Sequence, residues 1–328
     1  NVDDIYEYYG VKKNFKIKKL FYPNIRFGAF LYALAIFFYL ITSKRFDLAY
    51  GRFLHGIYIA SLLNYKVIYE SHAPIFARKD HRLFFFKKLI KSRNFKKLVV
   101  ISQVLKNMYL DKGYLSHSNI QVAHDGADVV ENFNSKNNLL GLKNNLKVGY
   151  VGHLYKGKGM EVILSLANKL DDDIEIHIIG GLEEDIKLWK NKISSKNIFF
   201  YGFIPHKQVG DYINALDVCL LPNQKIILAH GSNPSNISLN ISTFTSPLKL
   251  FEYMSHKKPI IASDFPVIRE VLNEKNSILV KYNDIDLWLS SIKQLKNSKF
   301  RNAISNQVLS DFNKFTWKNR VLELLNDI

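Results

Sequence analysis

The sequence predicts an α/β protein built from two open parallel sheets, and two features of the chain support this fold class. From residue 146 onward, short apolar runs alternate with amphipathic stretches, which is typical of parallel strands joined by crossover helices. The N-terminal half repeats the alternation less regularly, and a polar, strand-poor stretch at 132–145 separates the halves. We therefore expect domains at 1–140 and 141–310, with a helix at 311–328 that could pack back on the first domain.

The individual elements follow from the same alternation. Apolar runs in the C-terminal half predict strands at 146–152, 174–181, 197–204, 217–222, 259–263 and 277–280. Amphipathic stretches predict helices at 159–170, 183–194, 206–215, 247–256, 265–273, 284–296, 301–312 and 316–327. In the N-terminal half, strands are expected at 48–52, 66–71, 97–102 and 120–125.

One apolar segment, "FGAFLYALAIFFYLIT" at 27–42, is a candidate for membrane insertion. It has 16 residues between Arg26 and Lys44, fewer than the roughly 20 that a bilayer-spanning helix needs. We predict a buried or interfacial helix here.

Net charge and cysteine content restrict the partners and the compartment. The 328 residues carry a formal charge of +17, which indicates nucleic acid, an anionic membrane or phosphorylated substrates. The first 145 residues hold 23 basic and 10 acidic residues, and the remainder 23 and 19. A nucleic-acid reader is disfavoured because the sequence has no zinc-ligand spacing, basic zipper or aromatic RNA-binding signature. The single cysteine, Cys219, lies in the apolar run "DVCLLP", so we expect a buried residue and a reducing, cytoplasmic compartment.

The stretch "SPLKLFEYMSHKKPIIAS" at 246–263 predicts a helix whose start binds an anion. Ser246 suits the N-cap and Pro247 the first turn, so the N–H groups of Leu248 and Lys249 would face outward. In open α/β sheets such helix starts point into the ligand crevice.

Lys249 and Glu252 lie about one helical turn apart on this segment. A lysine can neutralise phosphate, and a carboxylate can accept hydrogen bonds from the two hydroxyls of a ribose. The pair is therefore consistent with a nucleotide site, and an ordinary surface ion pair is the alternative.

A second window, "VGYVGHLYKGKGMEV" at 148–162, adds a glycine- and lysine-rich turn between a strand and a helix. Gly152 and His153 follow the strand, and Lys156 to Gly159 precede the helix. Glycines permit close backbone approach and lysines supply positive charge, as phosphate-binding loops require. Neither a Walker pattern nor a G-x-G-x-x-G turn is present, so hydrolysis of nucleoside triphosphates and dinucleotide binding lose support.

Together with "YGFIPHKQVGDYINALDVCLLP" at 201–222, these two windows occur in the order seen in a known family. The chain resembles the retaining, nucleotide-sugar-dependent glycosyltransferases of family 4, from about residue 47 to near its end. The resemblance implies the GT-B fold, in which two Rossmann-like domains face each other across a cleft. It also implies a nucleoside diphosphate sugar bound by the C-terminal domain and an acceptor presented by the N-terminal domain.

Residue roles are carried over from this resemblance. It implies a catalytic role for His72, Lys158 and Glu252. It places the nucleotide and its diphosphate on Gly152, His153, Lys158, Gly202, Phe203, Ile204, Ser246, Pro247, Leu248, Lys249 and Glu252. On the acceptor side it points to Tyr50, Arg52, Glu70 and His72.

Two departures from the family pattern affect these expectations. The family has a glutamate eight positions before Glu252, where this chain has Phe244, which puts contacts to the donor sugar and activity in doubt. The first strand and glycine-rich loop of the acceptor domain are not visible before residue 47, so the N-terminal domain is expected to be abridged or the chain a fragment.

The expected activity is hexosyl transfer with retention to a glycan or lipid-linked acceptor, in lipopolysaccharide or capsule assembly. UDP is slightly preferred over GDP, and no cofactor or metal is expected, because a helix start and lysines can stabilise the leaving diphosphate. We interpret the acidic residues at 171–173 as a solvated turn.

Phenylalanines and lysines at 82–98 favour peripheral attachment to an anionic membrane, with a helix that has a solvated basic face as the alternative. The alternatives for function are a GT-B binding or scaffold protein with little or no catalysis, and an epimerase or phosphorylase on the same fold. A nucleic-acid binder is a third and remote option.

Overall fold

The computed structural model describes residues 4–77, 80–134, 139–193, 195–227 and 240–326. By contacts the chain forms two compact units. The C-terminal unit comprises Asp125–Glu323 and the first residues up to Val11, and the N-terminal unit comprises Lys12–His124 and Leu324–Ile328.

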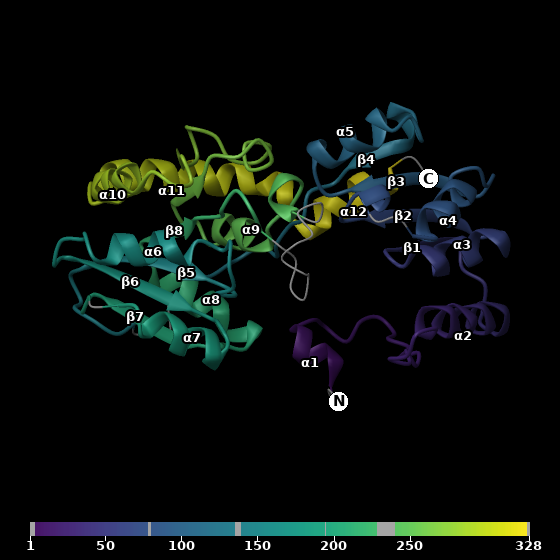
Figure 1. The fold of residues 1–328 in the computed structure, drawn as a ribbon, viewed down its shortest axis with the longest axis horizontal. Coiled ribbons are helices and arrows are strands. Elements are labelled where there is room, and N and C mark those ends of the chain that lie inside the picture. Colours follow the sequence, from purple (N-terminus) through teal and green to yellow (C-terminus); the bar gives the residue numbers. More distant parts are fainter. Residues whose placement is uncertain (1–3, 78–79, 135–138, 194, 228–239, 327–328) are drawn as a thin grey trace. The chain divides into compact units, whose positions relative to one another are not determined.

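The described strands of the C-terminal unit form one six-stranded parallel sheet (Figure 1). Its order is β10-β9-β8-β5-β6-β7, so the chain begins in the middle of the sheet and crosses over once. The strands are β5 (Leu146–Val151), β6 (Ile174–Ile179), β7 (Ile198–Gly202), β8 (Val218–Leu221), β9 (Ile260–Ser263) and β10 (Ile278–Val280). Every residue of β6, β8 and β9 is buried, as expected for parallel strands covered on both faces.

Helices surround this sheet, and α1 belongs to the same unit although it begins the chain. They are α1 (Ile5–Tyr9), α6 (Met160–Ala167), α7 (Glu183–Lys190), α8 (His206–Ala215), α9 (Leu248–Ser255), α10 (Ile285–Gln294) and α11 (Ser298–Phe312). Helix α12 (Trp317–Leu325) begins in this unit, and its Leu324 is buried in the N-terminal core with Ile68, Val99 and Ala123. Short 3-10 turns are η4 (Ile241–Thr243) and η5 (Asn313–Phe315). Helix α6 packs against β6 and α10, and α10 packs against β9 and β10, with its Trp288 fully buried in this core.

The described strands of the N-terminal unit form a four-stranded parallel sheet in the order β1-β2-β3-β4. Its strands are β1 (Leu48–Gly51), β2 (Lys66–Ser71), β3 (Phe95–Val100) and β4 (Ile120–Val122). Its helices are α2 (Gly28–Thr42), α3 (Leu54–Leu62), α4 (Arg82–Leu89) and α5 (Gln103–Asp111), with 3-10 turns η1 (Ile75–Ala77) and η2 (His117–Asn119). The two parallel sheets confirm the predicted α/β class.

The predicted helix at 265–273 is wrong, because this segment folds as consecutive turns. Apolar residues such as Ile268 and Leu272 are buried one helical turn apart, which imitates a helical pattern. The side chain of Asn276 accepts a hydrogen bond from Asn273 N and donates one to Val271 O. It therefore occupies the backbone groups that a continuing helix would need.

The segment at 82–98 is likewise divided, into α4 and the start of β3. Lys97 lies on β3, where it is buried and its Nζ donates to Gln121 Oε1 at 2.8 Å. Lys97 is thus removed from the basic surface that the sequence suggested, whereas Lys87 and Lys88 lie in the last turn of α4.

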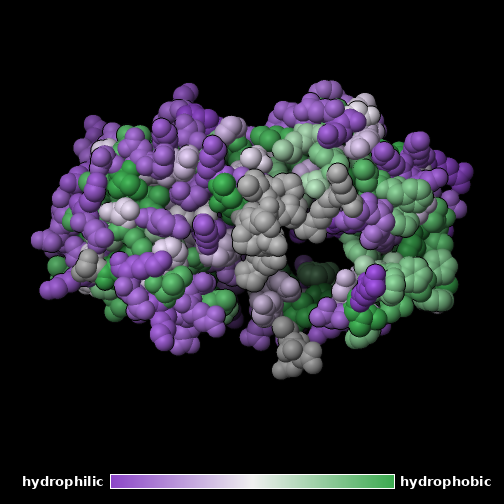
Figure 2. All heavy atoms as spheres, in the orientation of Figure 1, coloured by the Kyte–Doolittle hydropathy of each residue, from purple (hydrophilic) through white to green (hydrophobic). Residues whose placement is uncertain are grey.

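Helix α2 contains the apolar segment 28–42, and several of its large side chains are exposed. Figure 2 shows hydrophobic residues gathered over the α2 and α3 end of the N-terminal unit. Among the described residues, no helix has the length and apolar character that crossing a membrane requires.

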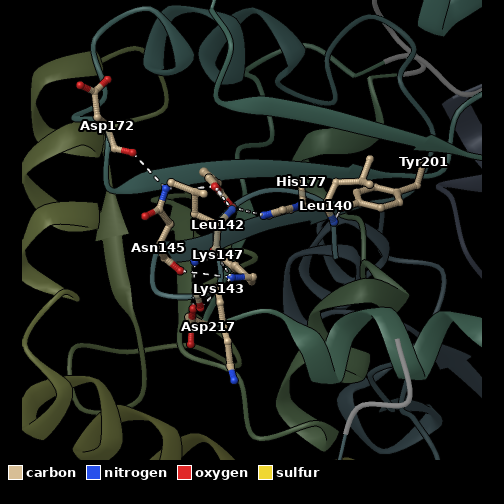
Figure 3. A network of polar contacts seen from close by, with 10 residues as sticks. Leu140, Leu142, Lys143, Asn145, Lys147, Asp172, His177, Tyr201 and Asp217 are labelled. Carbon is tan, nitrogen blue, oxygen red and sulfur yellow. Dashed lines mark hydrogen bonds and ion pairs between the residues drawn. The ribbon is translucent and has the colours of Figure 1, made fainter. Parts of the chain in front are cut away.

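The stretch that enters β5 is anchored to β6 by a polar network (Figure 3). The buried Glu175 accepts hydrogen bonds from Leu142 N at 2.7 Å and Asn145 Nδ2 at 3.0 Å. His177 bonds to Tyr201, whose hydroxyl accepts from Leu140 N. Burial, with a smaller effect of Lys147, lowers the pKa of His177 to about 4, so the ring is neutral near pH 7.

Candidate functional site

The turn from β5 to α6 depends on glycines that fit closely against the chain's own backbone. Gly157 and Gly159 both have φ of 91°, a left-handed conformation that favours glycine. A Cβ on Gly159 would lie 2.1 Å from Pro222 O, and one on Gly157 would lie 2.4 Å from Ile226 O. The loop therefore packs closely against the segment that follows β8, and the expected approach of its backbone to a phosphate stays a prediction.

Gly152, at the end of β5, makes room for Lys249 from the start of α9. It has φ of 133°, and a Cβ at this position would lie 2.9 Å from Lys249 Nζ. The same Nζ lies 3.8 Å from the centroid of the Tyr150 ring. Two windows that the sequence identified separately therefore meet in the fold.

The amine of Lys249 is buried and has no hydrogen-bond partner among the described residues. Burial, together with the nearby Lys158, holds its pKa well below the usual value, against an opposing effect of Glu252. Burial also lowers the pKa of Lys158. A buried amine without a partner is costly for the folded protein, so such a group points to an anionic ligand that would pair with it.

Helix α9 begins one residue later than predicted. Pro247, with φ of −76° and ψ of 115°, occupies the N-cap position, and Leu248 is the first helical residue. The hydroxyl of Ser246 accepts a hydrogen bond from Asp125 N at 2.9 Å instead of capping the helix. The N-cap expectation for Ser246 is therefore wrong, because the extended Pro247 separates it from the first turn. The N–H groups of Leu248 and Lys249 still lie in the first turn, where a helix leaves them unpaired.

Two buried tyrosines that sequence reasoning missed hold this site together. Tyr253 of α9 accepts a hydrogen bond from Val151 N at 2.8 Å, which fixes the helix to the end of β5. Tyr150 donates to His153 O at 2.7 Å and fixes the start of the glycine turn. Both tyrosines lie within the two sequence windows quoted above. A tyrosine among apolar residues is predicted to belong to the hydrophobic core, so the sequence alone does not assign either one to the site.

Glu252 is partly buried on α9 and faces His206, the first residue of α8. His206 Nε2 lies 3.5 Å from Glu252 Oε1. A hydrogen bond to Glu252 raises the pKa of His206, and the charges of Glu252 and Asp128 add to this against partial burial. His206 was not among the predicted site residues.

The expected base-binding residues lie where β7 ends beside β6. Gly202 has φ of 75°, and its carbonyl accepts a hydrogen bond from Gly180 N at 2.8 Å. Phe203 is 73% exposed, so its ring is available to a planar ligand. Ile204 is partly buried and His153 is exposed on the β5 side. In the sheet order the ends of β5, β6 and β7 are neighbours.

Phe244 is buried, at 3% exposure, directly after η4. This position therefore contributes an apolar side chain to the packing of the loop before α9.

The predicted acceptor-side residues belong to the N-terminal unit and lie at the ends of its strands. The structure brings Glu70 and His72 together: His72 Nε2 pairs with Glu70 Oε1, and Glu70 is buried at the end of β2. Tyr50 lies on β1, opposite Ile68 of β2, and is 43% exposed. Arg52 follows β1 and is exposed. Their roles stay predictions.

Among the described residues, no group of three or more His, Cys, Asp or Glu side chains could hold a metal ion. The acidic residues at 171–173 form a surface turn, where Asp171 pairs with Lys293 at 2.9 Å and Asp173 pairs with Lys296. Cys219 is buried on β8, and burial raises the pKa of its thiol to about 12. The expectation that no metal takes part stays a prediction.

Comparison with solved structures identifies the fold. A sucrose-phosphate synthase from Thermosynechococcus elongatus is similar with a TM-score of 0.70 at 16% identity, covering 93% of this chain and 78% of that one. Anabaena Alr3699/HepE, solved in complex with UDP, has a TM-score of 0.70 at 14% identity, covering 90% and 82%. The fold is GT-B.

Sequence comparisons agree with the GT-B assignment and add a class of activity. The family model described as "Glycosyl transferases group 1" matches residues 145–298, which include the β5–α6 turn and α9. An uncharacterized glycosyltransferase of Methanocaldococcus jannaschii, MJ1069, is 26% identical over 346 residues, covering 97% of this chain and 82% of its own. These matches support a glycosyltransferase.

The buried amine of Lys249 predicts a particular dependence of stability on pH. Because its pKa is lowered in the folded state, the unfolded chain binds the extra proton between that value and about 10.5. Stability attributable to this group therefore rises with pH through that window. We expect Lys249→Met to stabilise the C-terminal unit by about 1 kcal/mol or more near pH 7, and the gain over wild type to shrink toward pH ~10.

Urea unfolding followed by tryptophan fluorescence measures this, because Trp189, Trp288 and Trp317 all lie in the C-terminal unit. Lys187→Met, at an exposed position of α7, is the matched control and should show no such trend. A Lys249→Met variant that is less stable than wild type at every pH would contradict a neutralised, unpaired amine.

Proposed function

We propose that this protein transfers a hexosyl residue from a nucleoside diphosphate sugar to a glycan or lipid-linked acceptor, with retention at the anomeric carbon. The observation that carries the proposal is the buried, unpaired Lys249 amine at the start of α9, with Lys158 near it and Glu252 one turn further on. These groups are suited to a diphosphate and a ribose respectively.

The proposed chemistry is electrostatic. Breaking the bond between sugar and phosphate develops negative charge on the leaving diphosphate. The amines of Lys249 and Lys158 and the free N–H groups of the first turn of α9 would stabilise that charge in a site shielded from water. Lysine amines with lowered pKa values would take up protons as the anion binds. Their positive charge would then lie beside the leaving diphosphate.

The donor nucleotide is proposed to lie across the ends of β5, β6 and β7. Glu252 would accept hydrogen bonds from the ribose hydroxyls, and the exposed ring of Phe203 offers a stacking surface for the base. UDP is preferred over GDP in this proposal, and the bound UDP in the HepE structure supports it by analogy of fold. No metal is included, since the amines and the helix start supply the positive charge.

The acceptor is proposed to bind to the N-terminal unit, through the Glu70–His72 pair and the neighbouring Tyr50 and Arg52. Because Glu70 is buried and in contact with His72, the pair can hold or move a proton at the imidazole. Assembly of lipopolysaccharide or capsule is the proposed setting, in the cytoplasm, on the strength of the family resemblance.

One observation favours a second candidate. Phe244 is buried where the family carries a glutamate, so a donor-sugar contact is replaced by apolar packing. A protein that binds the nucleotide with little or no turnover, and acts as a binding or scaffold subunit, is the alternative.

We also propose peripheral attachment to an anionic membrane through α4. Phe84 is 58% exposed, and Lys88 Nζ lies 5.6 Å from its ring centroid, so an apolar group and basic groups share one surface. Such a surface would bring the enzyme to a lipid-linked acceptor.

Replacement of Glu252 tests the donor site. We expect wild type to bind UDP or GDP in a calorimetric titration, and Glu252→Ala to bind roughly ten- to a hundredfold more weakly, because hydrogen bonds to a charged acceptor contribute about 1.5–3 kcal/mol. Glu184→Ala, at an exposed position of α7, is the control and should bind like wild type. Equal affinity of Glu252→Ala and wild type would remove Glu252 from the site, and binding of neither nucleotide to wild type would refute the proposal.

Vesicle flotation tests the membrane proposal. Wild type should float with vesicles that contain anionic lipid and much less with zwitterionic ones, and a Phe84→Ser/Lys87→Gln/Lys88→Gln variant should float several-fold less. Flotation that is independent of anionic lipid would contradict the proposal.

A further inference from the structure

His206 lies where the two halves of the proposed nucleotide site meet. It is the first residue of α8, which follows β7 after the short segment 203–205, and its Nε2 lies 3.5 Å from Oε1 of Glu252 on α9. The side chain of His206 is 69% exposed and that of Glu252 28%. The pair is therefore open to a ligand that approaches the ribose-binding carboxylate.

The charged groups that act on the pKa of His206 are acidic. Glu252 of α9 lies 3.5 Å from the ring, and the charge of Asp128, in the segment after β4, acts in the same direction. Helix α1 packs against α8 and is followed by Gly10, where a Cβ would lie 3.9 Å from Nδ1 of the imidazole. Glu252 and Asp128 both raise the pKa of His206, chiefly through the hydrogen bond to Glu252.

We propose that His206 is a positioning residue for Glu252, and that nucleotide binding is strongest when the imidazole is protonated. The inference rests on the proposed function, because it assigns Glu252 to the ribose. A protonated His206 pairs with Glu252 Oε1 and fixes the orientation of the carboxylate.

The Glu252 carboxylate can still bind a ribose while it contacts His206. A carboxylate has two oxygens with about four lone-pair directions, so a contact at Oε1 leaves Oε2 and part of Oε1 free for two ribose hydroxyls. A cation here also favours an anionic ligand. Because an exposed ion pair contributes little to folding, stabilising the fold does not explain the arrangement.

The first test measures the pair without ligand. The pKa of His206 is followed by NMR of its ring proton in wild type and in Glu252→Gln, with His206→Gln for assignment. The pKa should fall in Glu252→Gln, since its largest cause is removed. An unchanged pKa would overturn the inference.

The second test measures UDP affinity from about pH 5.5 to about pH 8.5. Because the terminal phosphate of UDP itself titrates near pH 6, the readout is the ratio of wild-type to His206→Gln affinity at each pH. Wild type should bind roughly three- to tenfold more tightly than the variant at low pH, and the ratio should approach one at high pH. A ratio that does not vary with pH would overturn the inference, since a merely structural role predicts that outcome.

Two control variants locate the titrating group. His117→Gln removes an exposed histidine of the N-terminal unit and should retain both the wild-type affinity and the wild-type pH profile. His153→Gln removes an exposed histidine of the proposed diphosphate site, so its affinity can change, but the pH-dependent step should remain. Loss of the step in His153→Gln would assign it to His153 and overturn the inference. If wild type binds neither UDP nor GDP, the proposed function fails and the inference with it. If wild type binds UDP but the affinity ratio to His206→Gln does not change with pH, the inference about His206 fails while the proposed function stands.

Discussion

The candidate site depends on one interaction that is incomplete in the protein itself: the Lys249 amine is buried at the start of α9 without a hydrogen-bond partner among the described residues. Burying an amine in this way opposes folding, and nearby Lys158 increases the effect. Gly152, which has no Cβ, leaves room for the end of this side chain at the end of β5. A bound anion that pairs with the Lys249 amine would offset the cost of burying it.

The surrounding architecture serves to hold that amine in place. The order of the six-stranded sheet sets the ends of β5, β6 and β7 side by side. Tyr253 fixes α9 to β5 through Val151 N, and the left-handed Gly159 holds the loop against the segment after β8. Both contacts involve backbone groups at the two ends of the β5–α6 turn, so the surroundings of the Lys249 amine are positioned by the fold itself.

Much of this could be predicted from the sequence. The strands of both units were recognisable because parallel strands buried on both faces are continuous apolar runs bounded by Gly, Pro or Asn. Lys249, Lys158 and Gly152 were found because helix starts and glycine turns have local signatures. The meeting of Gly152 with Lys249 was not predictable, since it depends on the packing of segments about a hundred residues apart.

The errors have a similar cause. At 265–273 the apolar spacing is helical, but the competing hydrogen bonds come from Asn276, outside the window. Ser246 has the composition of an N-cap, but the partner that it finds, Asp125, is distant in sequence. No sequence motif marks His206 as a site residue, and only its position opposite Glu252 in the fold indicates a role.

The most direct test of the central claim is the number of protons taken up when UDP binds. Calorimetric titrations at about pH 8.5, in buffers with different ionisation enthalpies, measure it where the phosphate of UDP and the histidines no longer contribute. If the buried Lys249 amine is neutral in the free protein and pairs with the diphosphate, uptake should reach about one proton per UDP, or more where Lys158 contributes. Tight binding with no proton uptake would contradict the account.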